Sequence, residues 1–377
     1  MSTVVKVDFP VYAINSIADN QFVIAGGGGK SKTGIPNVLE IFSVTSVKDS
    51  SSQLNLRFDT DSICENRPAP MNLSVRCSSS GQVCLAFGTD EECAVVEWIR
   101  KPESCLELKH FLKADNSNQF QTCVSFSPDG KYLVTGSDGG LLKIWSTKNF
   151  SLLHTFKTGN EIEGLSISPN SKILVASCKS GKVFSYLFDN FKNDGEVFWT
   201  AVAERQNQYR SRCLQFSSQR TLPHFSFYSI YIPKTRSKKN PLPSCLVRFD
   251  SRLIADKKSL INESTSIPCS MDISDDGVFI GLGTLEGDIF IYIAFSLQKL
   301  RKFEKVHSGF ITGLKFIPTS KRTQALLSGN DACVLSVSID NKINLTSVPS
   351  RTMISIWLSI VLIVFSILIG FFFISVI

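Results

Sequence analysis

The stretch "VSFSPDGKYLVTGSDGGLLKIW", Val124 to Trp145, contains three short apolar segments separated by two turns. The first turn is Pro128-Asp129-Gly130 and the second is Asp138-Gly139-Gly140. Proline, aspartate and glycine at such points favour tight turns between antiparallel strands. The stretch therefore predicts three strands that pair one after another, the last of them ending at Ile144-Trp145.

The same pattern recurs along the chain. Clear copies cover residues 73–99, 165–188, 271–293 and 314–339, and looser copies start near Ala13 and Cys213. Seven copies at steps of about 40 to 60 residues match the roughly 40–45 residues of a four-stranded WD-repeat blade, lengthened by loops. The sequence therefore predicts an all-β, seven-bladed WD-repeat β-propeller over residues 1–350. A β-sandwich is the alternative, but the regular spacing disfavours it.

The first strand offers a way to close the ring. A closed ring of blades leaves few exposed sheet edges. We therefore expect "TVVKVDFP", residues 3–10, to pair into the last blade.

The C-terminal stretch is apolar without interruption. The 24 residues from Ile354 to Ile377 carry no charge, and a membrane-spanning helix needs about 20 such residues. The sequence predicts a transmembrane anchor over residues 353–377. The N-terminus lacks the features of a signal peptide, so we expect insertion as a C-terminal tail. Lys342 and Arg351 precede the span and predict that the propeller lies in the cytosol.

A glycine run in "IAGGGGKSKTGIPN", Ile24 to Asn37, raises the question of a phosphate-binding loop. Gly29-Lys30-Ser31 matches the end of G-x-x-x-x-G-K-[ST], but Ile24 stands where the leading glycine belongs. Gly34 and Pro36 oppose the helix that should follow. The stretch therefore predicts a loop between two strands. A nucleotide-hydrolysing enzyme is disfavoured, and a mobile hairpin loop without a role is the remaining alternative.

No catalytic set stands out in the rest of the sequence. The eleven cysteines include no C-x-x-C pair, which disfavours a zinc or redox site, and in a reducing compartment we expect them to be small buried apolar residues. His307 precedes the first strand of a repeat, where we expect a structural role. None of the four histidines has metal-ligand spacing (His110, His154, His224 and His307).

Basic residues give the chain a net charge of +7, and the densest run is "PKTRSKKN", residues 233–240. A solvated loop is one interpretation, and a lipid or partner contact is the other. Stacking aromatics do not alternate with these lysines and arginines, so we expect no nucleic-acid partner.

Together the repeats, the apolar tail and the glycine-rich loop resemble one family. The sequence is similar to the membrane-bound WD-repeat guanine nucleotide-exchange factors of the endoplasmic reticulum that activate the Sar-type small GTPase of the COPII coat. The resemblance rests mainly on "AGGGGKSKTGIPN", residues 25–37. Softer support comes from "CSMDISDDG", residues 269–277, and "HSGFITGLKFIP", residues 307–318.

The resemblance implies a function and a site. It implies nucleotide exchange without covalent chemistry, at the start of COPII vesicle formation for transport from the endoplasmic reticulum to the Golgi. It also implies a single-pass protein of the endoplasmic reticulum membrane and a loop-organising potassium ion. The residues it assigns are a potassium loop and a tip that contacts the GTPase (Gly26, Gly27, Gly28, Gly29 and Asn37 for the ion; Gly34, Ile35, Pro36 and Asn37 for the tip).

A membrane-tethered scaffold without exchange activity is the alternative function. It would share the propeller and the anchor. The Gly34-Ile35-Pro36-Asn37 tip favours the exchange factor, because a pure scaffold has no need of it.

Overall fold

The computed structural model describes most of the chain. The residues described are 2–30, 34–46, 54–58, 68–78, 80–100, 105–113, 119–196, 208–217, 225–235, 242–250, 252–261, 266–320, 323, 327, 329–350 and 364–366.

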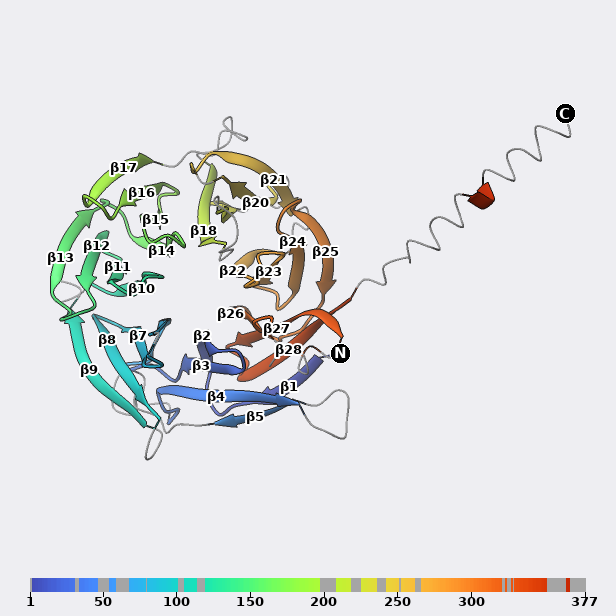
Figure 1. The fold of residues 1–377 in the computed structure, drawn as a ribbon, viewed down its shortest axis with the longest axis horizontal. Coiled ribbons are helices and arrows are strands. Elements are labelled where there is room, and N and C mark those ends of the chain that lie inside the picture. The colour runs from blue at the N-terminus through green and yellow to red at the C-terminus, as the bar shows by residue number, and fades with distance from the viewer. Residues whose placement is uncertain are drawn as a thin grey trace, which may run out of the picture.

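Seven four-stranded antiparallel sheets form a ring around a central axis (Figure 1). This confirms the predicted propeller and excludes the sandwich. Blades 1 to 3 contain β2 (Val11–Ala18), β3 (Gln21–Gly26), β4 (Val38–Ser46), β5 (Leu54–Phe58); β6 (Asn72–Cys77), β7 (Val83–Thr89), β8 (Glu92–Ile99), β9 (Cys105–Lys113); and β10 (Gln121–Phe126), β11 (Tyr132–Ser137), β12 (Leu141–Ser146), β13 (Leu152–Lys157).

The remaining blades follow the same order from the axis outward. Blades 4 to 6 contain β14 (Ile162–Ile167), β15 (Ile173–Cys178), β16 (Val183–Leu187), β17 (Lys192–Glu196); β18 (Tyr209–Phe216), β19 (Phe227–Pro233), β20 (Ser244–Phe249), β21 (Ala255–Ile261); and β22 (Pro268–Ile273), β23 (Phe279–Thr284), β24 (Ile289–Ile293), β25 (Gln298–Phe303). Blade 7 contains β26 (Ile311–Phe316), β27 (Asn330–Ser338), β28 (Lys342–Pro349) and β1 (Ser2–Lys6).

The two ends of the propeller meet in blade 7. β1 pairs antiparallel with β28, with Ser2 opposite Thr346 and Lys6 opposite Lys342. The N-terminal strand is thus the outermost strand of the last blade, as the sequence predicted.

Contacts between the innermost strands show that neighbouring blades have the same orientation. At the beginning of β26, the Thr312 hydroxyl donates to the carbonyl of Val11 at the beginning of β2, at 2.7 Å. Beyond the ends of the same two strands, the Ser320 hydroxyl donates to the Asp19 carboxylate at 2.8 Å. Blades 7 and 1 are therefore joined at both faces of the ring.

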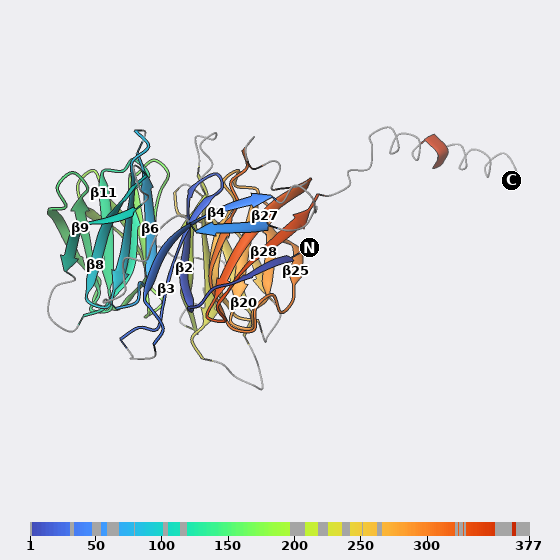
Figure 2. The ribbon, with the colours of Figure 1, turned by 90° about the horizontal axis from the view of Figure 1, so that it is seen from below.

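The propeller has two flat faces, which we call the glycine-loop face and the β28 face. The innermost strands begin at the glycine-loop face, where the β3–β4 connection opens, and end at the β28 face, where β28 reaches Pro349. Figure 2 shows the β3–β4 connection and the end of β28 on opposite sides of the ring. Lys234, which starts the basic run, follows β19 on the glycine-loop face, while residues 236–240 lie outside the described residues.

Apolar side chains fill the spaces between neighbouring sheets. One cluster joins blades 1 and 2 and contains Val23, Leu39, Leu85 and Trp98. The cysteines only partly follow the predicted burial. Six of the described ones are buried, but Cys77 and Cys105 are exposed, so the prediction is wrong for these two. Both lie at strand ends near the surface, which spacing alone does not reveal.

The predicted anchor, residues 353–377, lies outside the described residues apart from a short helical segment at 364–366. Within the part of the chain that is described, no helix has the length and apolar character needed to cross a bilayer. The anchor therefore stays a prediction from the sequence.

His307 has the structural position expected from the sequence. Its ring is buried, with Nδ1 3.0 Å from Asp340 Oδ1 and Nε2 2.8 Å from the Ser336 hydroxyl. Burial lowers the pKa of His307 below its ordinary value of 6.5, although the bond to Asp340 opposes this. A neutral ring suits these contacts, since it donates to the carboxylate and accepts from the hydroxyl.

We expect this histidine to make the fold sensitive to mild acid. A histidine whose pKa is lowered on folding favours the unfolded state as the pH falls below the unfolded value of 6.5. His307→Gln should lower the free energy of unfolding by about 2 kcal/mol at pH 7.5, because Asp340 or Ser336 loses a partner. Denaturant unfolding at pH 7.5 and 5.5 tests both effects. Wild type should lose more stability over this interval than the variant, and equal losses would contradict the assignment.

Candidate functional site: the glycine-rich loop

The glycine-rich loop connects two neighbouring strands of blade 1. β3 ends at Gly26, β4 begins at Val38, and the two pair directly, with Gly26 opposite Val38. A strand follows the loop where a phosphate-binding loop requires a helix N-terminus. The predicted strand-to-strand connection is confirmed, and the hydrolase hypothesis loses its structural basis.

Asn37 holds the base of the loop closed. Its side chain is only 6% exposed. The Oδ1 atom accepts the N–H of Gly29 at 2.9 Å, and Nδ2 donates to the Gly29 carbonyl at 3.0 Å. The side-chain amide thus forms the same pair of bonds that a residue of a neighbouring strand would form. We call this pair the Asn37–Gly29 clamp.

Gly27 allows the clamp to form. Its φ of 136° is a conformation that residues with side chains rarely adopt. A Cβ at this position would lie 2.4 Å from Asn37 Oδ1 and 2.6 Å from the Pro36 carbonyl oxygen. The glycine is therefore required by both the backbone conformation and the close approach of the opposite side of the loop.

The structure separates the predicted tip residues into two groups. Gly34 and Pro36 are exposed and accessible to a partner, whereas Asn37 is buried in the clamp. Ile35 is half-buried and packs against the apolar cluster shared by blades 1 and 7, which includes Phe9. The role of Ile35 and Asn37 in contacting a GTPase stays a prediction. Residues 31–33 lie outside the described residues.

The loop also contacts the neighbouring blade through its first lysine. Lys30 Nζ lies 2.7 Å from Asp90 Oδ2 in the β7–β8 turn, and this hydrogen bond raises the pKa of Lys30. The Asp90 carbonyl in turn accepts the N–H of Gln121 at the start of β10. Contacts thus run from the loop through blade 2 to blade 3. The sequence analysis did not predict this ion pair, because Asp90 is 60 residues away from Lys30 along the chain.

In three blades an exposed apolar residue directly precedes the innermost strand, on the same face as the glycine-rich loop. Phe310, Met71 and Phe120 directly precede the innermost strands of blades 7, 2 and 3, with exposed fractions of 40%, 53% and 49%. Blades 4 and 5 have polar residues there, Glu161 and Gln208. We call the three apolar residues the apolar arc. The three residues share one face of the ring, and the sequence analysis did not single them out.

Two neutral oxygen atoms lie close together beside Gly27. The Pro36 carbonyl oxygen and Asn37 Oδ1 both lie within 2.6 Å of the point that a Gly27 Cβ would occupy. Neutral carbonyl oxygens of this kind hold potassium in proteins. These two oxygens are of the neutral type that binds a monovalent cation, and no cluster of three acidic, histidine or cysteine groups occurs among the described residues. The predicted potassium ion stays a prediction.

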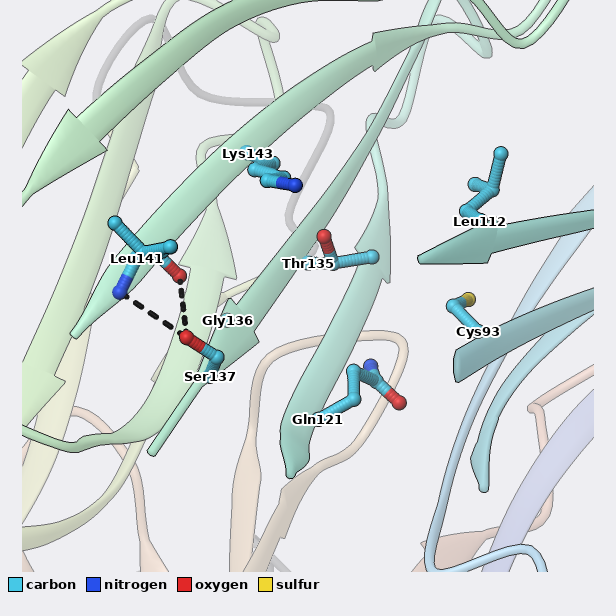
Figure 3. A pocket seen from close by; sticks show the side chains of 8 residues that line it. All are labelled: Cys93, Leu112, Gln121, Thr135, Gly136, Ser137, Leu141 and Lys143. Atoms are coloured by element: carbon cyan, nitrogen blue, oxygen red, sulfur yellow. Dashed lines mark hydrogen bonds between the residues drawn. The ribbon is translucent and has the colours of Figure 1, made fainter. Parts of the chain in front are cut away.

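A small cavity between blades 2 and 3 is the other concave feature of interest (Figure 3). Its volume of about 10 Å³ is the size of one water. Lys143 beside it donates to the Lys113 carbonyl at 3.2 Å, and the Leu141 N–H donates to the Ser137 hydroxyl at 3.1 Å. The buried Gln121 Oε1, which also lines the cavity, makes no hydrogen bond in the structure. The volume is too small for a nucleotide or a metabolite.

The sequence is similar to those of known WD-repeat proteins, which agrees with the propeller fold. Residues 107–146, from β9 through β12, match the family "WD domain, G-beta repeat". The chain is 26% identical to "Guanine nucleotide-exchange factor SEC12" of Mus musculus, over 95% of this chain and 93% of the mouse protein. It is 23% identical to "SEC12-like protein 2" of Arabidopsis thaliana, over 85% of this chain and 75% of that protein.

A third relative extends the similarity to a yeast. The "Guanine nucleotide-exchange factor SEC12" of Candida glabrata is 21% identical, over 89% of this chain and 72% of that protein. These similarities span nearly the whole propeller. They confirm the resemblance to WD-repeat guanine nucleotide-exchange factors that the sequence predicted.

The Asn37–Gly29 clamp makes a prediction about order in the loop. Asn37→Ala removes both hydrogen bonds and should cost roughly 1–2 kcal/mol of local stability. The amides of residues 27–30 should then exchange with solvent about tenfold faster, while β3 stays protected. Hydrogen exchange measured by mass spectrometry tests this. The control is Asn37→Asp, which keeps the acceptor for the Gly29 N–H and should show a smaller change. Unchanged exchange in Asn37→Ala would show that the clamp does not order the loop.

Proposed function

We propose that this protein is the guanine nucleotide-exchange factor for a Sar-type small GTPase. The observation that carries the proposal is the similarity to named exchange factors over 95% of the chain. The proposed reaction is GDP release and GTP loading at the endoplasmic reticulum membrane, which starts COPII vesicle formation. The alternative from the sequence, a scaffold without exchange activity, has no observation of its own in the structure.

Nucleotide exchange needs a binding surface and no catalytic acid or base. A protein that binds the nucleotide-free GTPase more tightly than the nucleotide-bound form weakens nucleotide binding by the same factor. The described residues suit this mechanism, because the glycine-loop face is an exposed surface and the cavity between blades 2 and 3 has room for only one water.

The proposed surface combines the loop tip with the apolar arc. Gly34 and Pro36 are exposed at the tip. The Lys30–Asp90 ion pair joins the loop to blade 2, beside Met71 and Phe120. In this proposal Asn37 acts through the clamp, which keeps the backbone of the loop in one shape for the GTPase. A preordered loop loses less conformational entropy when a partner binds.

A potassium ion is proposed to support the same loop. Asn37 Oδ1 and the Pro36 carbonyl oxygen, which approach each other beside Gly27, are the oxygens that would take part in holding it. When bound, the ion would supply only electrostatic attraction to these dipoles. The residues themselves keep the loop folded and present Gly34 and Pro36.

Residues 353–377 are proposed to anchor the protein in the membrane of the endoplasmic reticulum, with the propeller in the cytosol. The support is the uncharged length of residues 354–377 and the basic residues before them. Anchoring places GTPase activation next to the membrane where a coat assembles.

The proposal predicts faster GDP release from a purified Sar-type GTPase when this protein is added in potassium buffer. Met71→Ser with Phe120→Ser should raise the concentration needed for half-maximal release about tenfold, since two exposed apolar contacts of roughly 0.7 kcal/mol each are lost. A fluorescent GDP analogue provides the measurement. The control is Lys148→Ser on the β28 face, which should behave as wild type.

Each result has a clear meaning. No acceleration by the folded wild-type protein would leave the scaffold alternative and remove the exchange function. Acceleration that the double variant retains fully would keep the exchange function but place the GTPase elsewhere on the propeller.

A change of cation tests the proposed ion. Replacing potassium by lithium at constant ionic strength should speed hydrogen exchange of residues 27–30 and weaken GTPase binding, because the smaller ion fits the same oxygens poorly. Asn37→Ala should not respond to the change, since one of the proposed ligands is missing. Identical exchange rates in both salts for wild type would overturn the potassium proposal without affecting nucleotide exchange.

A further inference from the structure

An exposed phenylalanine lies on the face opposite to the glycine-rich loop. Phe295 is 72% exposed and belongs to the β24–β25 turn of blade 6. This turn ends with Leu297 at a φ of 56°. The corresponding turns of blades 3 and 4 have the same feature, with Phe150 at 53° and Phe191 at 50°.

The other two turns show that the conformation does not require an apolar residue. Two positions before the residue with positive φ, blade 3 has Lys148 and blade 4 has Asp189. Blade 6 has Phe295 at this position. The turn conformation therefore does not require a phenylalanine, and among these three blades only blade 6 has one.

Two cations surround the exposed ring. The Lys257 ammonium lies 4.1 Å from the ring centroid and the Arg248 guanidinium carbon lies 5.2 Å from it. Both side chains also donate to the Phe295 carbonyl, at 3.1 Å and 2.7 Å. The ring thus stands among basic groups that come from β20 and β21 of blade 5.

More apolar groups surround this turn. The Ala294 N–H donates to the carbonyl of Val278, whose side chain is exposed, and Ile254 is exposed at the β20–β21 turn of blade 5. Carboxylates on this face have partners of their own, and Asp276 accepts the N–H of Val278. Asp275 accepts the N–H of Thr319, and Asp250 pairs with Arg252.

The chain leaves the propeller on the same face. β28 ends at Pro349 on the β28 face, and the uncharged stretch begins five residues later at Ile354. Five residues span at most about 18 Å. The contact between Thr319 of blade 7 and Asp275 of blade 6 shows that the two blades meet at this face. The start of the uncharged stretch therefore lies within about 18 Å of the end of β28 in blade 7, which adjoins blade 6 at this face.

We propose that Phe295, Arg248 and Lys257 form a docking surface for the anionic bilayer that holds residues 354–377. The phenyl ring enters the boundary between headgroups and acyl chains, and the two cations bind lipid phosphates and carboxylates. This inference rests on the membrane anchor of the proposed function, but not on nucleotide exchange.

The chemistry of the three side chains suits a lipid surface. An aromatic residue flanked by lysine and arginine has an apolar part for the acyl boundary and charges for the headgroups. The attraction to an anionic leaflet is local, so only basic groups held near the surface contribute. The anchor keeps this face at the membrane, and weak contacts then suffice to orient the propeller.

Hydrogen exchange of the full-length chain tests the docking surface. The chain is placed in vesicles of phosphatidylcholine with phosphatidylserine, in vesicles of phosphatidylcholine alone, and in detergent. We expect residues 294–297 to exchange several-fold more slowly in the anionic vesicles than in detergent. In neutral vesicles most of this protection should be lost, because the attraction of each basic side chain to anionic lipid is absent. The turn at residues 147–150 is the internal control and should be unchanged.

Phe295→Asp is the matched variant, because blade 4 carries an aspartate in the corresponding turn. It should keep the thermal stability of wild type and lose the protection of residues 294–297 in anionic vesicles. Lys148→Asp, at the corresponding turn of blade 3, should change nothing. Floating of the chain with the vesicles during density centrifugation confirms the anchor separately.

Two results would overturn the proposal. If the chain floats with the vesicles but residues 294–297 exchange as fast as in detergent, the anchor stands and the docking surface does not. If the chain does not float with vesicles, the anchor and the docking surface both fail. GDP release in solution is unaffected by either result, so the exchange function is judged independently.

Discussion

Closure of the ring by β1 determines how the other blades are arranged. β1 pairs with β28 along its full length, so the first residues of the chain complete the sheet that the last strands began. An open edge at this point would leave a row of unpaired backbone groups. Within each antiparallel blade the second and third strands end on opposite faces of the ring. The glycine-rich loop follows a second strand, β3, and β28 is a third strand, so the loop and the end of β28 lie on opposite faces.

The fold was largely predictable because its signals are local. Turns such as Pro128-Asp129-Gly130 and alternating apolar residues lie within a few positions of each other, and they recur seven times. Pairing of the N-terminal strand with blade 7 was also predictable, because closure leaves one place for it. Burial of the cysteines was less predictable. Cys77 and Cys105 are exposed, whereas Cys178, which also ends a strand, is buried. Exposure at a strand end therefore depends on what packs against it, which composition does not reveal.

The strand-to-strand loop was predictable from the sequence, but the contacts that hold it were not. The glycine run and Asn37 were recognised in the sequence, yet the clamp between Asn37 and Gly29 requires knowing that β3 and β4 pair up to Gly26 and Val38. The Lys30–Asp90 ion pair and the apolar arc join residues that are distant in sequence. They arise only when the blades are placed side by side. Residue type therefore indicated the loop, while tertiary contacts indicate how it keeps its shape.

The two faces have consequences for where a GTPase would be activated. β28 has eight residues, which at about 3.3 Å each correspond to roughly 25 Å between the faces. With the β28 face on the bilayer, a GTPase bound to the glycine-rich loop is separated from the lipid by the thickness of the propeller. A weak, salt-sensitive contact of Phe295, Arg248 and Lys257 with lipid allows the propeller to tilt on its anchor. Such tilting would bring the glycine-loop face closer to the membrane without breaking the ring.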